Sequence, residues 1–227
     1  MTLTDSERER LLRESGLAFA GRITASVTHE LNNVLSTVGE LSGLLEDVAA
    51  AGSLSGAVAQ ERLARIVTGL TAQVKRGAAI VKRLNRFAHS TDDTIQSVDL
   101  ADLIELIAGL ADPLIRRHEV TLKTLVDGAP PIIETNTFVL EQLLYLWIDV
   151  AASASGRAQP ITVSCRRHSS GAEIEIAWHP GRALEAPSGQ DTLFEVLARE
   201  IRGAVRTAQG DDGFCHRSIT LPHDIEA

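Results

Sequence analysis

The chain has 227 residues, with 22 Lys and Arg against 30 Asp and Glu and a formal net charge of −8. This length allows one large or two ordinary domains, and the acidic balance argues against generic nucleic-acid binding. No run approaches the roughly 18–20 apolar residues that span a bilayer, the polar start predicts no secretory signal, and Cys165 and Cys215 lack metal or disulfide spacing. We therefore expect a reduced, cytoplasmic protein.

The first ninety residues predict two long helices, over about 5–50 and 58–88, with a glycine-rich turn at 52–56. Apolar residues recur at spacings of three and four in both helices, strictly alternating in the first, which is the pattern of a helix packed in a bundle. In the first helix these residues are Val27, Leu31, Val34, Val38, Leu41, Leu45 and Val48. In the second they are Leu63, Val67, Leu70, Val74, Ala78, Val81 and Leu84. Because a lone hairpin leaves much of each seam in water, we expect a homodimer that forms a four-helix bundle.

The heptad pattern turns one histidine outward. At about 100° per residue, His29 lies nearly opposite Val27 and therefore on the exposed side of the first helix. Asn33 shares this face one turn later. The same exposed stripe includes Arg22, Ser36 and Glu40.

After a break at 91–94 the pattern becomes mixed. Helices are expected at 99–117, capped by Asp99, and at 137–155 and 191–208. Strands are expected at 120–125, 161–166, 173–178 and 214–221. This mixture predicts an α+β layer sandwich. The expected domains are a helical hairpin at 1–90, a linker at 91–97 and an α+β domain at 98–227.

Residues 21–33 resemble the H-box of sensor histidine kinases. They read Gly21-Arg22-Ile23-Thr24-Ala25-Ser26-Val27-Thr28-His29-Glu30-Leu31-Asn32-Asn33. The resemblance implies that His29 accepts phosphate, that Glu30 assists proton removal, and that Asn33 orients water for dephosphorylation of a partner. The sequence departs from the pattern at Val34, where many members have a proline that bends the helix.

The resemblance continues into a domain like the kinase ATP-binding domain, whose magnesium-and-phosphate helix carries two asparagines. The matching segment is Leu140-Glu141-Gln142-Leu143-Leu144-Tyr145-Leu146-Trp147-Ile148-Asp149-Val150-Ala151. Leu146 and Val150 stand where the asparagines belong, and neither can coordinate a hard cation. The adenine-reading turn is replaced by Ala177-Trp178-His179-Pro180-Gly181-Arg182, and the second glycine-rich box is missing. We therefore expect a degenerate α/β-sandwich of the histidine-kinase ATPase type that binds neither nucleotide nor metal.

Together these features resemble the kinase-derived histidine phosphotransferases. The resemblance implies that His29 exchanges phosphate with the aspartate of a response-regulator receiver domain, which brings its own Mg²⁺, and that no intrinsic cofactor is needed. In this interpretation Glu30 hydrogen-bonds the opposite ring nitrogen and fixes the tautomer. The expected receiver-binding residues are Arg22, Ser26, Ser36, Glu40 and Lys75.

Several alternatives stay open at this point. The chain could be a phosphatase that dephosphorylates a receiver through Asn33, or a non-catalytic dimeric scaffold that binds a receiver or a kinase. An ATP-dependent kinase ranks last. Zinc is not expected at His29, because the second histidine of a His-Glu-x-x-His pattern is absent. The basic residues of the second helix either face an acidic partner or form an ordinary solvated surface. They are Lys75, Arg76, Lys82, Arg83 and Arg86.

Overall fold

The computed structural model describes residues 3–50, 57–156, 158–169, 171–181, 189–210 and 213–224. The turn predicted at 52–56 lies outside these residues. The chain divides into two compact units, one formed by residues 21–86 and the other by residues 1–20 together with 87–227. The start of the first helix thus packs with the α/β part of the chain. The functional division expected at 90 and 98 stays a prediction.

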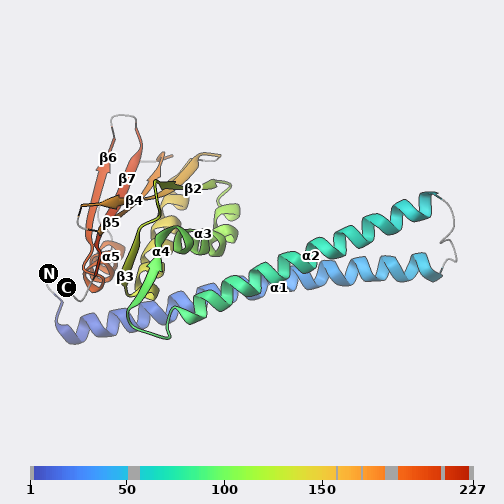
Figure 1. Ribbon diagram of the computed structural model, residues 1–227, viewed down its shortest axis with the longest axis horizontal. Helices are drawn as coiled ribbons and strands as arrows, with labels where there is room; N and C mark the ends of the chain where they lie inside the picture. Colours follow the sequence, from blue (N-terminus) through green and yellow to red (C-terminus); the bar gives the residue numbers. More distant parts are fainter. Residues whose placement is uncertain are drawn as a thin grey trace. The chain divides into compact units, whose positions relative to one another are not determined.

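Two long helices run side by side, α1 (Asp5–Ala50) and α2 (Ala57–His89) (Figure 1). The predicted face of α1 is confirmed: Val27, Val34 and Val48 are only 5%, 4% and 5% exposed, and the other four predicted members are half-buried. The helix starts with a capping box, in which the Thr4 N–H donates to the Glu7 carboxylate at 2.9 Å. This backbone hydrogen bond lowers the pKa of Glu7.

In the single chain, the predicted apolar line of α2 is buried only in part. Ile66 and Ile80 are 4% and 3% exposed, whereas Val67, Val74 and Val81 are 49%, 63% and 52% exposed. The buried face is therefore rotated away from the predicted line of valines. The reason is that glycines, which give no apolar signal in a sequence, make close contacts between α2 and α1.

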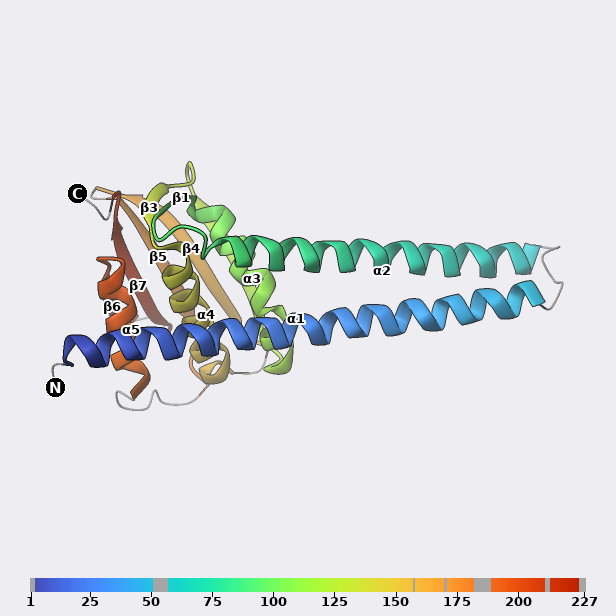
Figure 2. The same ribbon diagram turned by 90° about the horizontal axis from the view of Figure 1, so that it is seen from below.

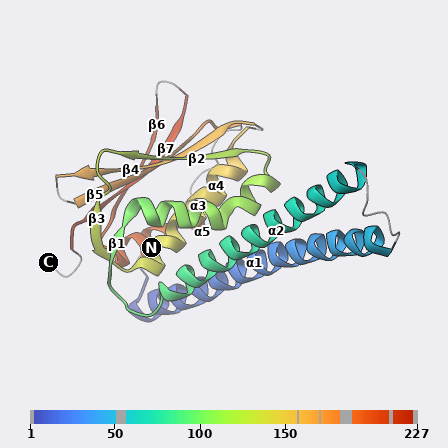
Figure 3. The ribbon, with the colours of Figure 1, turned by 45° about the vertical axis from the view of Figure 1, so that its right-hand side comes forward.

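The α/β unit contains a two-stranded and a five-stranded sheet. Its strands are β1 (Gln96–Asp99), β2 (Thr121–Asp127), β3 (Ile132–Thr135), β4 (Pro160–His168), β5 (Gly171–Trp178), β6 (Ala204–Gln209) and β7 (Cys215–Pro222). Its helices are α3 (Leu100–Arg117), α4 (Thr137–Ala154) and α5 (Gly189–Glu200). β1 pairs antiparallel with β3. The larger sheet has the order β2-β4-β5-β7-β6, and only the β2–β4 pair is parallel. The three helices cover one face of this sheet (Figures 2 and 3), which confirms the predicted α+β sandwich.

The helix expected at 191–208 is wrong in its second half. α5 ends at Glu200, and the chain then pairs with β7 as β6. Arg202 has a φ of 49°, and a Cβ on Gly203 would lie 2.3 Å from the Ile219 Cδ1 atom. This reversal needs a residue without a side chain at position 203, which ends the helix. The short strands β1 and β3 were not predicted, and β1 begins inside the expected linker.

The core of the α/β unit is built around α4. Leu140, Leu143 and Ile148 are at most 1% exposed, as expected for a helix that is apolar on all sides. α4 is long and apolar enough to cross a membrane, but 72% of it is buried inside the structure. It therefore has the character of a core helix.

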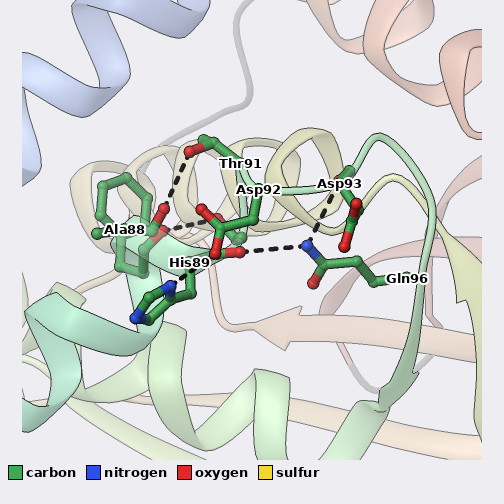
Figure 4. Close-up of polar contacts among 8 residues, drawn as sticks. Ala88, His89, Thr91, Asp92, Asp93 and Gln96 are labelled. Atoms are coloured by element: carbon green, nitrogen blue, oxygen red, sulfur yellow. Dashed lines mark hydrogen bonds and ion pairs between the residues drawn. The ribbon is translucent and has the colours of Figure 1, made fainter.

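Side-chain hydrogen bonds cap the C-terminal end of α2, just before β1 (Figure 4). The His89 Nδ1 atom lies 2.6 Å from the Asp92 carboxylate. The Thr91 hydroxyl donates to the Ala88 carbonyl at 2.9 Å, and the Gln96 amide donates to the His89 carbonyl at 3.2 Å. The Thr91 and Gln96 bonds satisfy carbonyls that the helix leaves without intrahelical partners.

An aromatic cluster joins the two helix ends to α4. The Phe19 ring of α1 lies 5.3 Å from Phe87 of α2, 5.6 Å from Phe138 and 5.4 Å from Tyr145 between centroids. Phe19 is fully buried, and a Cβ on Gly16 would lie 3.2 Å from the Phe138 ring. Such ring contacts add to the free energy of apolar burial.

We expect Phe19→Ala to lower the free energy of unfolding by about 3–5 kcal/mol, because it removes a fully enclosed ring. Urea denaturation followed by circular dichroism measures this change. The control is Leu17→Ala on the same helix, where the side chain is 75% exposed and the expected effect is below about 0.5 kcal/mol. Equal losses in both variants would contradict the packing described for Phe19.

Candidate functional site

His29 lies in the middle of α1 and is exposed to solvent, as the heptad pattern predicts. Its Nδ1 atom lies 3.4 Å from the Asn33 side-chain nitrogen Nδ2, one helical turn further on. The Thr37 hydroxyl donates to the Asn33 backbone carbonyl at 3.0 Å. With Nδ1 facing Asn33, the Nε2 atom is the ring nitrogen left for a reacting partner.

Glu30 points in a different direction from its neighbour. One residue along a helix is a rotation of about 100°, which turns Glu30 toward α2 and leaves it only 7% exposed. Its Oε1 atom lies 3.3 Å from the Arg76 Nη2 atom. The side chains of Arg76 and Glu30 are 45% and 10% exposed. This contact stabilises a carboxylate that would otherwise be costly to bury.

Two glycines bring α2 close to α1 beside this ion pair. A Cβ on Gly77 would lie 3.3 Å from the Val34 Cγ1 atom, and a Cβ on Gly69 would lie 3.0 Å from the Leu41 Cδ1 atom. α1 is continuous through Val34, the position at which the resembling kinases often have proline. The Val34–Gly77 contact thus fixes the helix spacing next to Arg76.

The five expected receiver-binding residues all lie in the unit of residues 21–86. Arg22, Ser36 and Glu40 are exposed on α1, and Ser26 is half-buried. By helical rotation these residues fall on the side of α1 that carries His29. Lys75 is exposed on α2, next to Arg76 in the chain. Their role in binding a receiver stays a prediction.

The nucleotide-binding positions suggested by the resemblance do not fit a magnesium–nucleotide ligand. Leu146 is 7% exposed in α4 and Val150 is half-buried, and neither offers an oxygen ligand to a hard cation. Across the described residues, no group of three or more His, Cys, Asp or Glu side chains is placed to hold a metal.

The end of β5 packs directly against the end of α4. The Gly181 N–H donates to the Ala154 carbonyl at 2.8 Å, and Pro180 forms a bridge with Ser155. A Cβ on Gly181 would lie 2.7 Å from the Gly156 Cα atom. The backbone at Gly181, in the segment that replaces the adenine-reading turn, therefore lies directly against the backbone that follows α4.

Similarity to known proteins extends over most of the chain. It is 25% identical over 182 residues to the C4-dicarboxylate transport sensor protein DctS of Rhodobacter capsulatus, covering 77% of this chain and 26% of that protein. It is 27% identical over 194 residues to the sensor histidine kinase ZraS of Escherichia coli strain K12, covering 82% of this chain and 38% of that protein. The chain thus spans well under half the length of the curated relatives it matches. No family model matches it.

Two solved structures share its fold. The catalytic domain of histidine kinase ThkA aligns with a TM-score of 0.51 at 14% identity, covering 58% of this chain and 97% of that one. A histidine kinase from Burkholderia phymatum STM815 aligns with a TM-score of 0.51 at 15% identity, covering 98% of this chain and 100% of that one. The chain is histidine kinase-like.

The sequence analysis did not pair Arg76 with Glu30 in this histidine kinase-like chain. A signal was present: Glu30 lies 24 residues before Leu54, at the centre of the predicted turn, and Arg76 lies 22 residues after it. In an antiparallel hairpin such positions face each other. Asn33 and His29 were expected to share a face, and the structure brings their side chains together.

We expect Gly77→Leu to lower the free energy of unfolding by about 1–3 kcal/mol, because the added side chain overpacks the contact with Val34. Thermal and urea denaturation measure the loss. The control is Ala79→Leu, at an exposed position two residues away. If Gly77→Leu were as stable as this control, the close helix approach at Val34 would be wrong.

Proposed function

We propose that this chain is a histidine phosphotransfer protein of a two-component phosphorelay. His29 exchanges a phosphoryl group with the aspartate of a response-regulator receiver domain, and the chain needs no ATP. The observation that carries the proposal is the combination of an exposed His29 with apolar side chains at the nucleotide-binding positions, Leu146 and Val150. A kinase would need oxygen ligands at those positions, whereas a phosphotransfer protein would not.

The chemistry requires a neutral imidazole and an in-line phosphoryl donor. The Nε2 lone pair attacks phosphorus, the bond between phosphorus and the receiver aspartate breaks, and its electron pair returns to the aspartate carboxylate. The Mg²⁺ that neutralises charge is expected to come with the receiver. Arg22, Ser26, Ser36, Glu40 and Lys75 are the proposed contacts that place the receiver over His29.

The same helix pair supports a homodimer. Val67, Val74 and Val81 repeat every seven residues along α2 and are about half exposed or more, and Leu35 of α1 is 65% exposed. A regular apolar line on an amphipathic helix is typical of a bundle seam. A second copy of the hairpin that buries this line would complete a four-helix bundle. The proposed compartment is the cytoplasm, where receiver domains occur and where free cysteines such as the buried Cys165 stay reduced.

We expect acid-labile label to move from a phosphorylated receiver to the wild-type chain and to fall to background in His29→Ala, because the accepting nitrogen is removed. Label transfer from a panel of receivers measures this. The control is His89→Ala, which removes another exposed histidine and should leave transfer unchanged.

The other outcomes separate the alternative functions. Receivers that lose phosphate while the chain stays unlabelled would identify a phosphatase, and loss of that activity in Asn33→Ala would place it at this site. If the chain neither takes up label nor dephosphorylates any receiver, the result would favour a dimeric scaffold. Both outcomes would contradict phosphotransfer through His29.

We expect Val74→Lys to weaken dimerisation by at least about tenfold in dissociation constant, because a charge replaces an apolar side chain in the proposed seam. Light scattering after size exclusion, over a dilution series, measures the change. Thr68→Lys, at another exposed position of α2, is the control. A wild-type chain that is monomeric at micromolar concentration would overturn the homodimer.

A further inference from the structure

Adjacent polar side chains at the candidate site have separate partners. The Asn33 side-chain nitrogen Nδ2 lies 3.4 Å from the His29 Nδ1 atom. Glu30 extends to the other side of α1, where its carboxylate lies 3.3 Å from Arg76. The resemblance to sensor kinases implied the reverse arrangement, with the carboxylate at the imidazole. The side chain that contacts the ring is therefore an amide.

An amide and a carboxylate act differently on an imidazole. A carboxylate only accepts hydrogen bonds, so it favours the tautomer in which Nδ1 carries the proton. A side-chain amide can present its carbonyl oxygen to Nδ1–H or, after rotation, its NH₂ group to an Nδ1 lone pair. The two orientations of Asn33 have almost the same shape. Asn33 can thus pair with either neutral tautomer, and its orientation decides which one is favoured. In the structure the NH₂ nitrogen faces Nδ1, which favours the tautomer that carries its proton on Nε2.

We propose that Asn33 sets the proton position on His29, and that Arg76 is a positioning residue that holds the Glu30 carboxylate toward α2. This inference rests on the proposed phosphotransfer function. It assigns tautomer control to Asn33, in place of the role that the resemblance gives Glu30. Asn33 acts on the His29 ring, and Arg76 acts on the Glu30 carboxylate. Neither residue forms a bond to phosphorus.

The arrangement suits transfer in both directions. Before transfer, the Asn33 amide rotates from its orientation in the structure, so that its carbonyl accepts from Nδ1–H and the Nε2 lone pair is free to attack. When the Nε2–phosphorus bond has formed and the aspartate–phosphorus bond has broken, the ring is positively charged and loses its Nδ1 proton to solvent. The neutral phosphorylated ring then has an Nδ1 lone pair, to which the Asn33 NH₂ group donates in the orientation seen in the structure. A carboxylate at the same place would repel that lone pair.

Arg76 is held where it can carry out this role. It precedes Gly77, whose contact with Val34 sets the spacing of the helices. The Arg76 side chain is about half exposed and that of Glu30 is 10% exposed, so the pair is screened less than a surface pair. Replacing Arg76 would leave a nearly buried carboxylate without this cation, and rotation toward His29 and solvent would relieve its desolvation.

The experiment measures the tautomer directly. Nitrogen NMR of the ¹⁵N-labelled full chain reports the ratio of Nδ1–H to Nε2–H imidazole, with the His29 signals assigned by their loss in His29→Gln. We expect Asn33→Ala to shift this ratio about threefold toward Nδ1–H, the effect of losing one ordinary hydrogen bond to the Nδ1 lone pair, and Glu30→Gln to leave it unchanged. Asn32→Ala, an adjacent exposed amide, is the control for helix effects.

A double-mutant cycle tests Arg76. We expect Arg76→Met, which keeps much of the apolar stem, to shift the ratio toward Nδ1–H, and the additional change Glu30→Gln to remove that shift. Lys75→Met is the control for loss of one positive charge, and circular dichroism checks folding. A ratio that responds to Glu30→Gln with Arg76 intact, or that ignores Asn33→Ala, would overturn the inference.

These readouts are independent of phosphotransfer. If His29 takes no label from any receiver while the tautomer ratio behaves as expected, the proposed function fails and the assignment of Asn33 and Arg76 as ring-positioning residues stands. If label transfer occurs and the ratio ignores Asn33→Ala, the function stands and this inference fails.

Discussion

The close contact of α1 with α2 at Val34 and Gly77 is the constraint on which the candidate site depends. It determines which side of α1 is dry and therefore which side carries His29 into solvent. Because a helix rotates by about 100° per residue, the same contact sends Glu30 inward to Arg76 and leaves Asn33 beside the imidazole. One steric match between a valine and a glycine thus separates four polar side chains into two pairs.

Much of the helical part was predictable because its signal is periodic. The spacing of Val27, Val34 and Val48 gave the buried face of α1, and the exposure of His29 followed from it. The face of α2 was harder, since Gly69 and Gly77 make the contact while Val67 and Val74 stay exposed. A glycine that permits close packing looks the same in a sequence as a glycine that weakens a helix. The partner of Glu30 depended on this register, and it was missed for the same reason.

In the α/β part, the spacing of apolar residues identified the helices and strands that bury one face. It missed those whose position depends on a reversal of the chain. The hairpin of β4 and β5 alternates clearly and was predicted. β6 was taken for helix because residues 204–208 have no strong alternation, and all of β6 is exposed. Its identity comes from the reversal at Arg202 and Gly203 and from pairing with β7. Such pairing depends on a neighbouring strand, which the β propensity of residues 204–209 alone does not report.

The aromatic cluster at Phe19 has a mechanical consequence. Phe19 belongs to α1 and Phe87 to α2, and both rings meet Phe138 of α4. The two long helices are therefore clamped at their base as well as meshed at Val34 and Gly77. A lengthwise displacement of one helix against the other would have to disrupt both places at once. The hairpin therefore resists sliding of one helix against the other, so the side of α1 that carries His29 keeps its register with α2.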